Sequence, residues 1–178
     1  IGLATGTAVG VNALMGRALG AGQRERADKV ANHGILLALV GFVISAALGA
    51  TCSDLFFRSQ TQIENIIRMG NDYLRVVTIG SLGMFCQIMY ERLLQGTGRS
   101  ILSMYTQGLG AIINIILDPI FIFTLNMGVT GAAVATIIGQ FCGCALAIYF
   151  NHKKNTDITL SVKGFRPDFR LIGEIYAI

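Results

Sequence analysis

The distribution of charge is the feature that most constrains this chain. Between Arg99 and Lys153, Asp118 is the only residue with a formal charge, and further charge-free runs cover 1–16, 30–53 and 76–90. A helix needs about 20 predominantly apolar residues to cross the hydrocarbon core of a bilayer. The run 30–53 is already long enough. The pattern predicts an all-α polytopic membrane protein.

Composition supports this interpretation. Hydrophobic residues make up 53% of the 178 positions and charged residues only 13%, which is about half the usual share of a soluble domain. The mean hydropathy is +0.61. So few charges cannot cover the surface of a soluble fold, and the high apolar content excludes disorder. The four Cys have no Cys-x-x-Cys spacing, which excludes a disulfide scaffold and a zinc ribbon.

Hydropathy divides residues 1–150 into a transmembrane helical bundle. The long run after Arg99 exceeds one span, and Asn126–Thr130 provides a turn that splits it. Arg75 fits the third span if its side chain extends to the headgroups. The predicted spans are about 1–18, 31–55, 73–94, 101–125 and 130–150. Because the chain starts without Met inside an apolar run and stops within a helical pattern, we expect a longer polypeptide.

The basic residues predict the orientation of the bundle. Five spans place eleven of the 14 Lys and Arg residues on one side and only Arg58, Arg68 and Arg75 on the other. Cytoplasmic loops are enriched in Lys and Arg. We therefore expect a multi-pass protein of the cell membrane, in which loops 19–29 and 96–100 and the tail 151–178 are cytoplasmic.

Two stripes of small residues predict close helix packing. The first is Gly2, Gly6 and Gly10, and the second runs from Gly131 through Ala135 and Gly139 to Gly143. Small residues four positions apart let helix backbones approach closely in lipid.

The tail 151–178 differs from the spans and is predicted to be a cytoplasmic amphipathic linker toward the next helix. Phe165, Phe169, Ile172 and Tyr176 form one apolar stripe at helical spacing, and Pro167 stands where a helix would begin. Such a stripe suits a helix that lies in the membrane interface.

No motif of a soluble enzyme is present. The sequence has no phosphate-binding Gly-x-x-x-x-Gly-Lys, no His-Glu-x-x-His and no Gly-x-Ser-x-Gly. His33 and His152 have no companions at the spacing of metal ligands. We expect no enzymatic activity, no cofactor and no nucleic-acid partner.

Asp118 is the strongest candidate for a functional residue. It lies seven residues from the predicted end of its span, roughly 10 Å inside, where an ionised carboxylate costs about 2.5–3.5 kcal/mol. Pro119 frees a backbone carbonyl, Asn114 shares the helix face of Asp118, and Thr136 lies at similar depth on the next span. Asp118, Asn114 and Thr136 therefore predict an oxygen-lined site for H⁺ or Na⁺. The structural alternative is a carboxylate that caps the backbone at the kink.

Other polar residues are less specific. Glu91 and Arg92 are expected to pair locally near the cytoplasmic end of the third span. Gln140, like Gln87 and Gln107, lines a cavity or bonds between helices. Tyr73 belongs either to the extracellular mouth of a substrate cavity or to the interfacial aromatic belt.

Several segments resemble the multidrug and toxic compound extrusion (MATE) family, over nearly the whole chain. They are Gly16–Gly22 followed by Glu25–Ala27, Leu94–Gly98, Ile113–Phe121 with its Asn-x-x-x-Asp-Pro, and Gly128–Thr136. The resemblance implies helices 2–6 of a twelve-helix, two-lobe transporter. It also implies a secondary antiporter that exports cationic or amphipathic organic compounds in exchange for H⁺ or Na⁺.

The resemblance assigns Asn114, Asp118 and Thr136 to the ion-coupling site of the N-terminal lobe. It also implies that the first helix, with a further acidic residue, and the C-terminal lobe, which contains the cation site in some subgroups, lie outside this chain. The expected partners are therefore these segments, small organic substrates and the lipid bilayer. Three alternatives remain: a lipid-linked oligosaccharide flippase, which should line its cavity with Arg or Lys, an intramembrane enzyme with a second catalytic residue, and a non-transporting structural membrane subunit.

Overall fold

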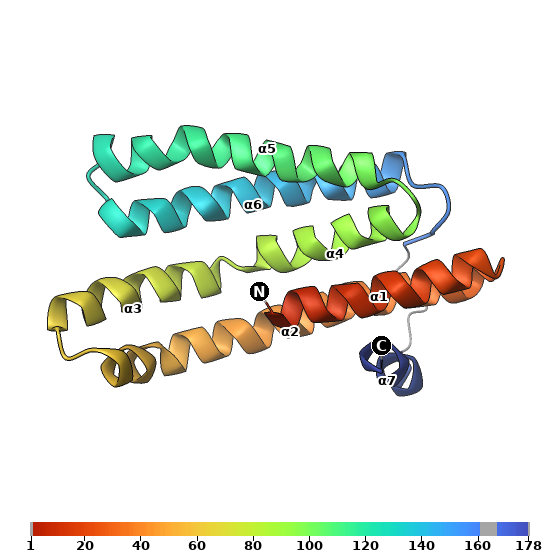
Figure 1. Ribbon diagram of the computed structural model, residues 1–178, viewed down its shortest axis with the longest axis horizontal. Coiled ribbons are helices and arrows are strands. Elements are labelled where there is room, and N and C mark those ends of the chain that lie inside the picture. The colour runs from red at the N-terminus through yellow and green to blue at the C-terminus, as the bar shows by residue number, and fades with distance from the viewer. Residues whose placement is uncertain (1, 161–166, 178) are drawn as a thin grey trace.

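The computed structural model describes residues 2–160 and 167–177, and its regular structure there is helical throughout. Five long helical segments run back and forth, and a short helix lies at one end (Figure 1). The elements are α1 (Gly2–Gly20), α2 (Arg24–Gln60), α3 (Glu64–Ile79), α4 (Leu82–Gly96), α5 (Ser100–Pro119), the π-helical turn η1 (Ile120–Thr124), α6 (Gly128–Lys153) and α7 (Phe169–Tyr176).

The alternation places the predicted cytoplasmic segments at one end of the bundle. The turn between α1 and α2, the turn between α4 and α5, and the end of α6 all lie at the right of Figure 1. Gly22 and Gly98 occupy these two turns with φ values of 72° and 77°, a left-handed conformation that glycine adopts without steric cost. The common end agrees with the orientation pattern; its assignment to the cytoplasm stays a prediction.

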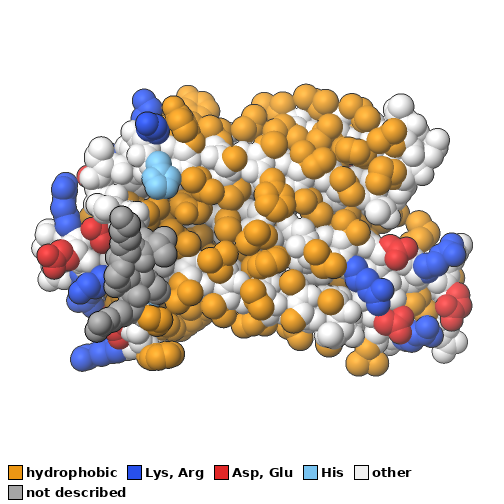
Figure 2. All heavy atoms as spheres, turned by 180° about the vertical axis from the view of Figure 1, so that it is seen from behind, with side chains coloured by type: hydrophobic (Ala, Val, Ile, Leu, Met, Phe, Trp, Pro, Cys, Tyr) orange, Lys and Arg blue, Asp and Glu red, His pale blue; other side chains and the backbone are white. Residues whose placement is uncertain are grey.

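Hydrophobic surface covers the middle of the bundle and charge gathers at its two ends (Figure 2). Within the described residues, three helical segments are long and apolar enough to cross a membrane: Arg24–Gln60, Ser100–Thr124 and Gly128–Lys153. Exposed side chains such as Val43, Leu48, Ile112 and Ile115 form this apolar exterior. Lipid is the environment in which such a surface is stable.

The packed core lies where α1, α2 and α4 meet. Val11 and Met15 of α1, Val30 of α2, and Met89 and Leu93 of α4 are almost completely buried there. A Cβ added to Gly34 would stand only 2.9 Å from both Met89 and Val11, so this glycine sets the approach of α2 to its neighbours. The core thus holds the α1–α2–α4 side together.

The interval 73–94, which hydropathy predicts as one span, falls on two helices. α3 ends at Ile79 and α4 begins at Leu82. The Ser81 hydroxyl donates to the Thr78 carbonyl over 2.7 Å, which competes with the regular helical ladder. A Cβ on Gly80 would collide with the Ile137 side chain of α6, so the lack of a side chain at Gly80 lets α6 approach closely.

The two small-residue stripes behave differently. Gly131, Ala135, Gly139 and Gly143 are all buried, as the packing prediction requires. In the first stripe only Gly10 makes such a contact, against the backbone of Ile175, whereas a Cβ on Gly2 or Gly6 would meet nothing within 4 Å. The first stripe is therefore not a continuous packing face within the described chain.

The tail helix α7 packs on α1 through a pair of residues outside the predicted stripe. Leu171 and Ile175 are 8% and 2% exposed, whereas Phe169 and Tyr176 are 84% and 54% exposed. Asp168 caps the helix by accepting from the Arg170 and Leu171 amides. Of the other two stripe residues, Ile172 is half-buried and Phe165 lies outside the described residues. α7 therefore has two apolar faces, one on the protein and one exposed.

Candidate functional site

The structure brings Asn114, Asp118 and Thr136 together between α5 and α6. Asn114 and Asp118 lie one turn apart near the end of α5, and the Asn114 amide contacts the Thr136 hydroxyl at 3.2 Å. Thr136 comes from α6, which packs along α5 over much of its length. The three residues form a polar cluster, hereafter the Asp118 site.

The Asn114 amide links the other two side chains. When its nitrogen faces the carboxylate, it donates to Asp118 Oδ2 over 2.6 Å, and its oxygen accepts from Thr136 Oγ1 at 3.2 Å. The reverse orientation would aim the amide oxygen at Oδ2, which fits only a protonated Asp118, since two bare acceptors repel. The Asn114 nitrogen therefore faces the Asp118 carboxylate, and the Asn114 oxygen faces Thr136.

The second carboxylate oxygen of Asp118 is open. Oδ1 is buried and has no hydrogen-bond partner among the described residues. Buried polar oxygens are nearly always paired, because an unpaired one keeps its full desolvation cost. Oδ1 can therefore accept a proton, or contribute one ligand to a cation together with the Asn114 and Thr136 oxygens.

Local backbone geometry positions the carboxylate. Pro119 follows Asp118 and has no N–H, so the helical ladder is interrupted there. The chain continues in η1, where the Leu125 amide donates to the Ile120 carbonyl five residues earlier over 2.9 Å. Such π-helical turns are rare and concentrate at functional sites. The predicted kink at Pro119 is thus a wider helical turn that follows the carboxylate directly.

Two glycines allow the approach of α5 to α6 beside this site. A Cβ on Gly139 would stand 2.8 Å from the Gly110 carbonyl oxygen and 3.8 Å from the Asn114 Cβ. The backbones therefore touch one turn from Asn114, and any side chain at position 139 would separate Asn114 from Thr136.

The two residues predicted for a substrate cavity come from different helices. Gln140 is on α6, one turn beyond Thr136, whereas Tyr73 is on α3. Both are half-buried. No hydrogen bond within the described chain joins either residue to the Asp118 site, so their role in substrate binding stays a prediction.

Sequence reasoning missed a second buried carboxylate, and the expected Glu91–Arg92 pair is wrong. Glu91 of α4 is 6% exposed, and Arg92 donates instead to Gln95 over 2.8 Å. Successive helical residues point in different directions, so neighbours in sequence do not face each other. The sequence signal for this buried carboxylate was Gln87, which lies one turn before Glu91 with no charged residue between them.

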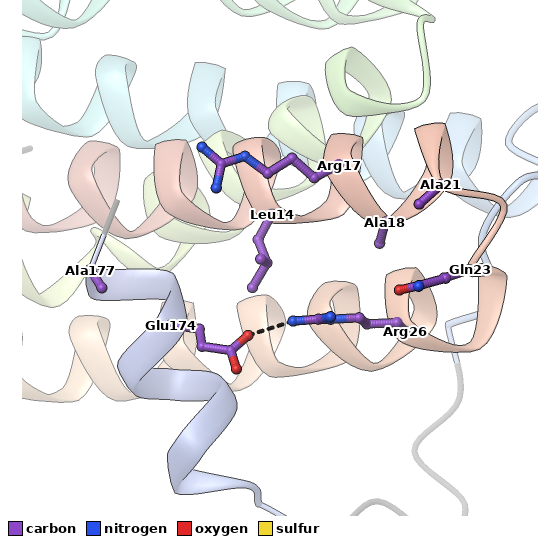
Figure 3. A pocket seen from close by; sticks show the side chains of 8 residues that line it. All are labelled: Leu14, Arg17, Ala18, Ala21, Gln23, Arg26, Glu174 and Ala177. Carbon is purple, nitrogen blue, oxygen red and sulfur yellow. Dashed lines mark hydrogen bonds and ion pairs between the residues drawn. The ribbon is translucent and has the colours of Figure 1, made fainter.

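A hollow of about 490 Å³ lies elsewhere, at the end of the bundle predicted to be cytoplasmic. Figure 3 shows Arg26 of α2 and Glu174 of α7 meeting across it, and the two side chains approach to 2.6 Å. Both partners are substantially exposed. The pair fastens α7 to α2 and is remote in the fold from the Asp118 site. The other lining residues are Leu14, Arg17, Ala18, Ala21, Gln23 and Ala177.

Comparison with curated proteins finds multidrug transporters. The chain is 32% identical over 151 residues to the probable multidrug resistance protein NorM of Thermotoga maritima, which covers 82% of this chain and 32% of that protein. It is 29% identical over 171 residues to the multidrug export protein MepA of Staphylococcus haemolyticus, covering 96% and 38%. The chain thus spans about a third of the length of these relatives.

Solved structures match the arrangement of helices closely. An inward-facing and an outward-facing multidrug resistance MATE family transporter of the MOP superfamily each match with a TM-score of 0.93 and 31% identity. Each match covers 98% of this chain and 40% and 39% of those chains, respectively. The MatE family model matches residues 1–120, which is most of the chain. On these grounds the chain belongs to the MatE family.

Proposed function

We propose that this chain is part of a secondary active antiporter that exports cationic or amphipathic organic compounds in exchange for H⁺ or Na⁺. The observation that carries the proposal is the Asp118 site, with an open buried carboxylate oxygen next to a neutral amide and a hydroxyl. The cargo would be moved without chemical conversion. The names of the relatives support organic compounds as substrates.

Exchange requires that ion binding at this site change with access to the two sides of the membrane. A proton would bind at the open Oδ1 of Asp118, and Na⁺ would take oxygen ligands from the same three side chains. The similar match to an inward-facing and an outward-facing structure supports a lobe that keeps its internal arrangement while access changes. Ion occupancy would then bias one orientation over the other.

The flippase and structural-subunit alternatives have less support. Between Arg99 and Lys153 no Lys or Arg is present to hold a lipid-linked phosphate. A structural subunit would gain nothing from an open buried carboxylate, which destabilises a helix in lipid by about 2.5–3.5 kcal/mol.

The test is Asp118→Asn in the full-length transporter that contains this chain. The substitution keeps the shape and removes the charge, so we expect folded protein in the membrane that no longer exports a fluorescent cation. Efflux is measured in inverted vesicles with a pH gradient and a Na⁺ gradient imposed separately, which identifies the coupling ion.

Glu174→Gln is the matched control, because it removes a carboxylate that is exposed at the surface. We expect it to transport normally. Normal efflux by a well-folded Asp118→Asn protein would leave Asp118 as a structural cap and end the proposal.

A further inference from the structure

Glu91 is a carboxylate that the Asp118 site does not use. It lies on α4 about one and a half turns before the turn to α5, and its side chain is 6% exposed. It is in no ion pair within the described chain. Moving a carboxylate out of water is costly unless hydrogen bonds or a cation compensate, so its surroundings must do so with neutral groups.

Three neutral donors surround this carboxylate. Oε1 accepts from Gln87 Nε2 over 2.9 Å and from Thr106 Oγ1 over 2.8 Å. Oε2 accepts from Gln107 Nε2 over 3.1 Å. The donors come from α4 and α5, and we call these four residues the Glu91 site. Both oxygens are satisfied, so the ionised form is stable here without a basic partner.

The Thr106 hydroxyl gives this site a second state. Its oxygen lies 2.8 Å from Glu91 Oε1 and 2.7 Å from the Ser103 carbonyl oxygen, yet it carries a single hydrogen. When Glu91 is ionised, that hydrogen points to Oε1. When Glu91 is protonated, the hydroxyl turns to the Ser103 carbonyl and accepts from the new carboxyl O–H. Both states fit with no heavy atom moved.

The charged side chains of α4 and α5 do not pair with Glu91. α5 contributes only neutral side chains near it, since Asp118 is the one charged residue of that helix and lies 12 positions from Thr106, about 18 Å along the axis. From α6, the Cys144 thiol lies close enough for its charge to interact with that of Glu91, and it is hydrogen-bonded to the Cys86 thiol of α4. On α4 itself, Arg92 is turned to Gln95.

Polar groups connect the Glu91 site to the end of the bundle predicted to be cytoplasmic. Ser103, whose carbonyl receives the Thr106 hydroxyl, also accepts from Gln95 over 2.8 Å through its own hydroxyl. Gln95 in turn accepts from Arg92, and the α4–α5 turn follows at Thr97–Arg99. In the other direction, the Gln87 amide lies against Gly143, beyond which Gly139 and Gly110 lead to Asn114.

We propose that Glu91 is a second proton-binding site of this lobe, loaded from the α4–α5 end. This inference rests on the proposed function, since it gives that transporter an additional titrating carboxyl. Loading forms an O–H bond between a proton delivered by water at the turn and Glu91 Oε1, and unloading breaks the same bond. No other bond changes, and the Thr106 hydrogen only rotates between its two acceptors.

The test is infrared difference spectroscopy of the full-length transporter in lipid between high and low pH. We expect Glu91→Gln to remove one carboxylic-acid C=O band that Asp118→Asn leaves in place. Thr106→Val should raise the titration midpoint of that band by about one pH unit, because the hydrogen bond to the ionised form is the stronger of the two it removes. Thr106→Ser, which keeps the hydroxyl, should restore the wild-type midpoint.

The possible results distinguish proton binding at Glu91 from the proposed ion coupling at Asp118. If Glu91→Gln leaves the difference spectrum unchanged, or if Thr106→Val leaves every band at its wild-type midpoint, Glu91 is a permanently ionised structural group and the inference is overturned. Asp118→Asn would then still decide the proposed function by its own efflux assay. If Glu91→Gln fails to fold, the comparison of Thr106→Val with Thr106→Ser still tests the inference, because both variants keep Glu91.

Discussion

Asp118 and Glu91 are both carboxylates placed among helices without an ion-pair partner in the described chain, but their surroundings differ. Asp118 keeps one buried oxygen open, and a single amide, that of Asn114, donates to its other oxygen. Glu91 has both oxygens occupied by three donors. The first arrangement suits a ligand that enters and leaves, and the second suits a charge whose proton is exchanged in place.

The two carboxylates also differ in how much of their environment follows from the local sequence and how much arises from helix packing. Asp118 stands alone in a long charge-free run, whereas Glu91 is followed at once by Arg92 and looks neutralised. A carboxylate with an unpaired oxygen, such as Asp118, has no charged residue near it in the sequence. A fully hydrogen-bonded one, such as Glu91, takes donors from another helix. Only the first property is visible in a sequence.

The largest expected effect comes from the contact that holds the Asp118 site together. Gly139→Leu should destabilise the protein by about 1–3 kcal/mol or prevent folding, because a side chain there meets the fixed Gly110 carbonyl. Folded yield and melting temperature measure this. Gly108→Leu is the control, since a Cβ at Gly108 meets nothing within 4 Å. Equal behaviour of the two variants would mean that α5 and α6 do not touch here.

The second largest effect is expected when the Asn114 amide is removed. Asn114→Ala removes the donor to Asp118 Oδ2, and a hydrogen bond to a charged group contributes about 1.5–3 kcal/mol. We expect ion-driven efflux to fall at least about tenfold while the Glu91 infrared band stays in place. Asn65→Ala, which removes an exposed amide of α3, serves for comparison. Loss of both carboxyl signals in Asn114→Ala would show that the two sites are one.

Removal of a hydroxyl should have a smaller effect. Thr136→Val preserves shape and deletes a neutral contact of Asn114, for which about 1 kcal/mol is typical. Efflux should fall about fivefold or less, with an unchanged Thr106-dependent infrared midpoint. A complete loss of efflux would show that Thr136 is an essential ligand and not only a supporting contact.

The smallest effect sets the baseline for an exposed carboxylate. Glu174→Gln breaks the ion pair with Arg26, whose side chains are 37% and 47% exposed. Exposed pairs contribute roughly 0–1 kcal/mol, so the melting temperature should change little and the change should vanish at high salt. A large, salt-independent loss would mean that α7 is a major part of the folded core.

The sequence predicted the helical membrane architecture and the meeting of Asn114, Asp118 and Thr136, because apolar runs and antiparallel depth follow from helix geometry. It could not predict the break between α3 and α4, or that the Ile137 side chain of a distant helix leaves no room for a Cβ at Gly80. Nor could it show that Leu171 and Ile175 are the buried face of α7, since two apolar faces compete there. Glu91 was missed for the same reason: its donors Thr106 and Gln107 belong to another helix.

The length of α2 has a mechanical consequence. Its 37 residues extend about 55 Å, against a hydrocarbon thickness of about 30 Å. Even at a tilt of about 40°, roughly a quarter of the helix remains outside the hydrocarbon. The charge-free stretch 30–53 is about 36 Å long, so a shift of little more than about half a turn in either direction from a centred position moves Lys29 or Asp54 into the hydrocarbon. The charged residues at its two ends therefore fix the depth of α2 in the membrane. The depth of the other helices of the lobe is set relative to α2.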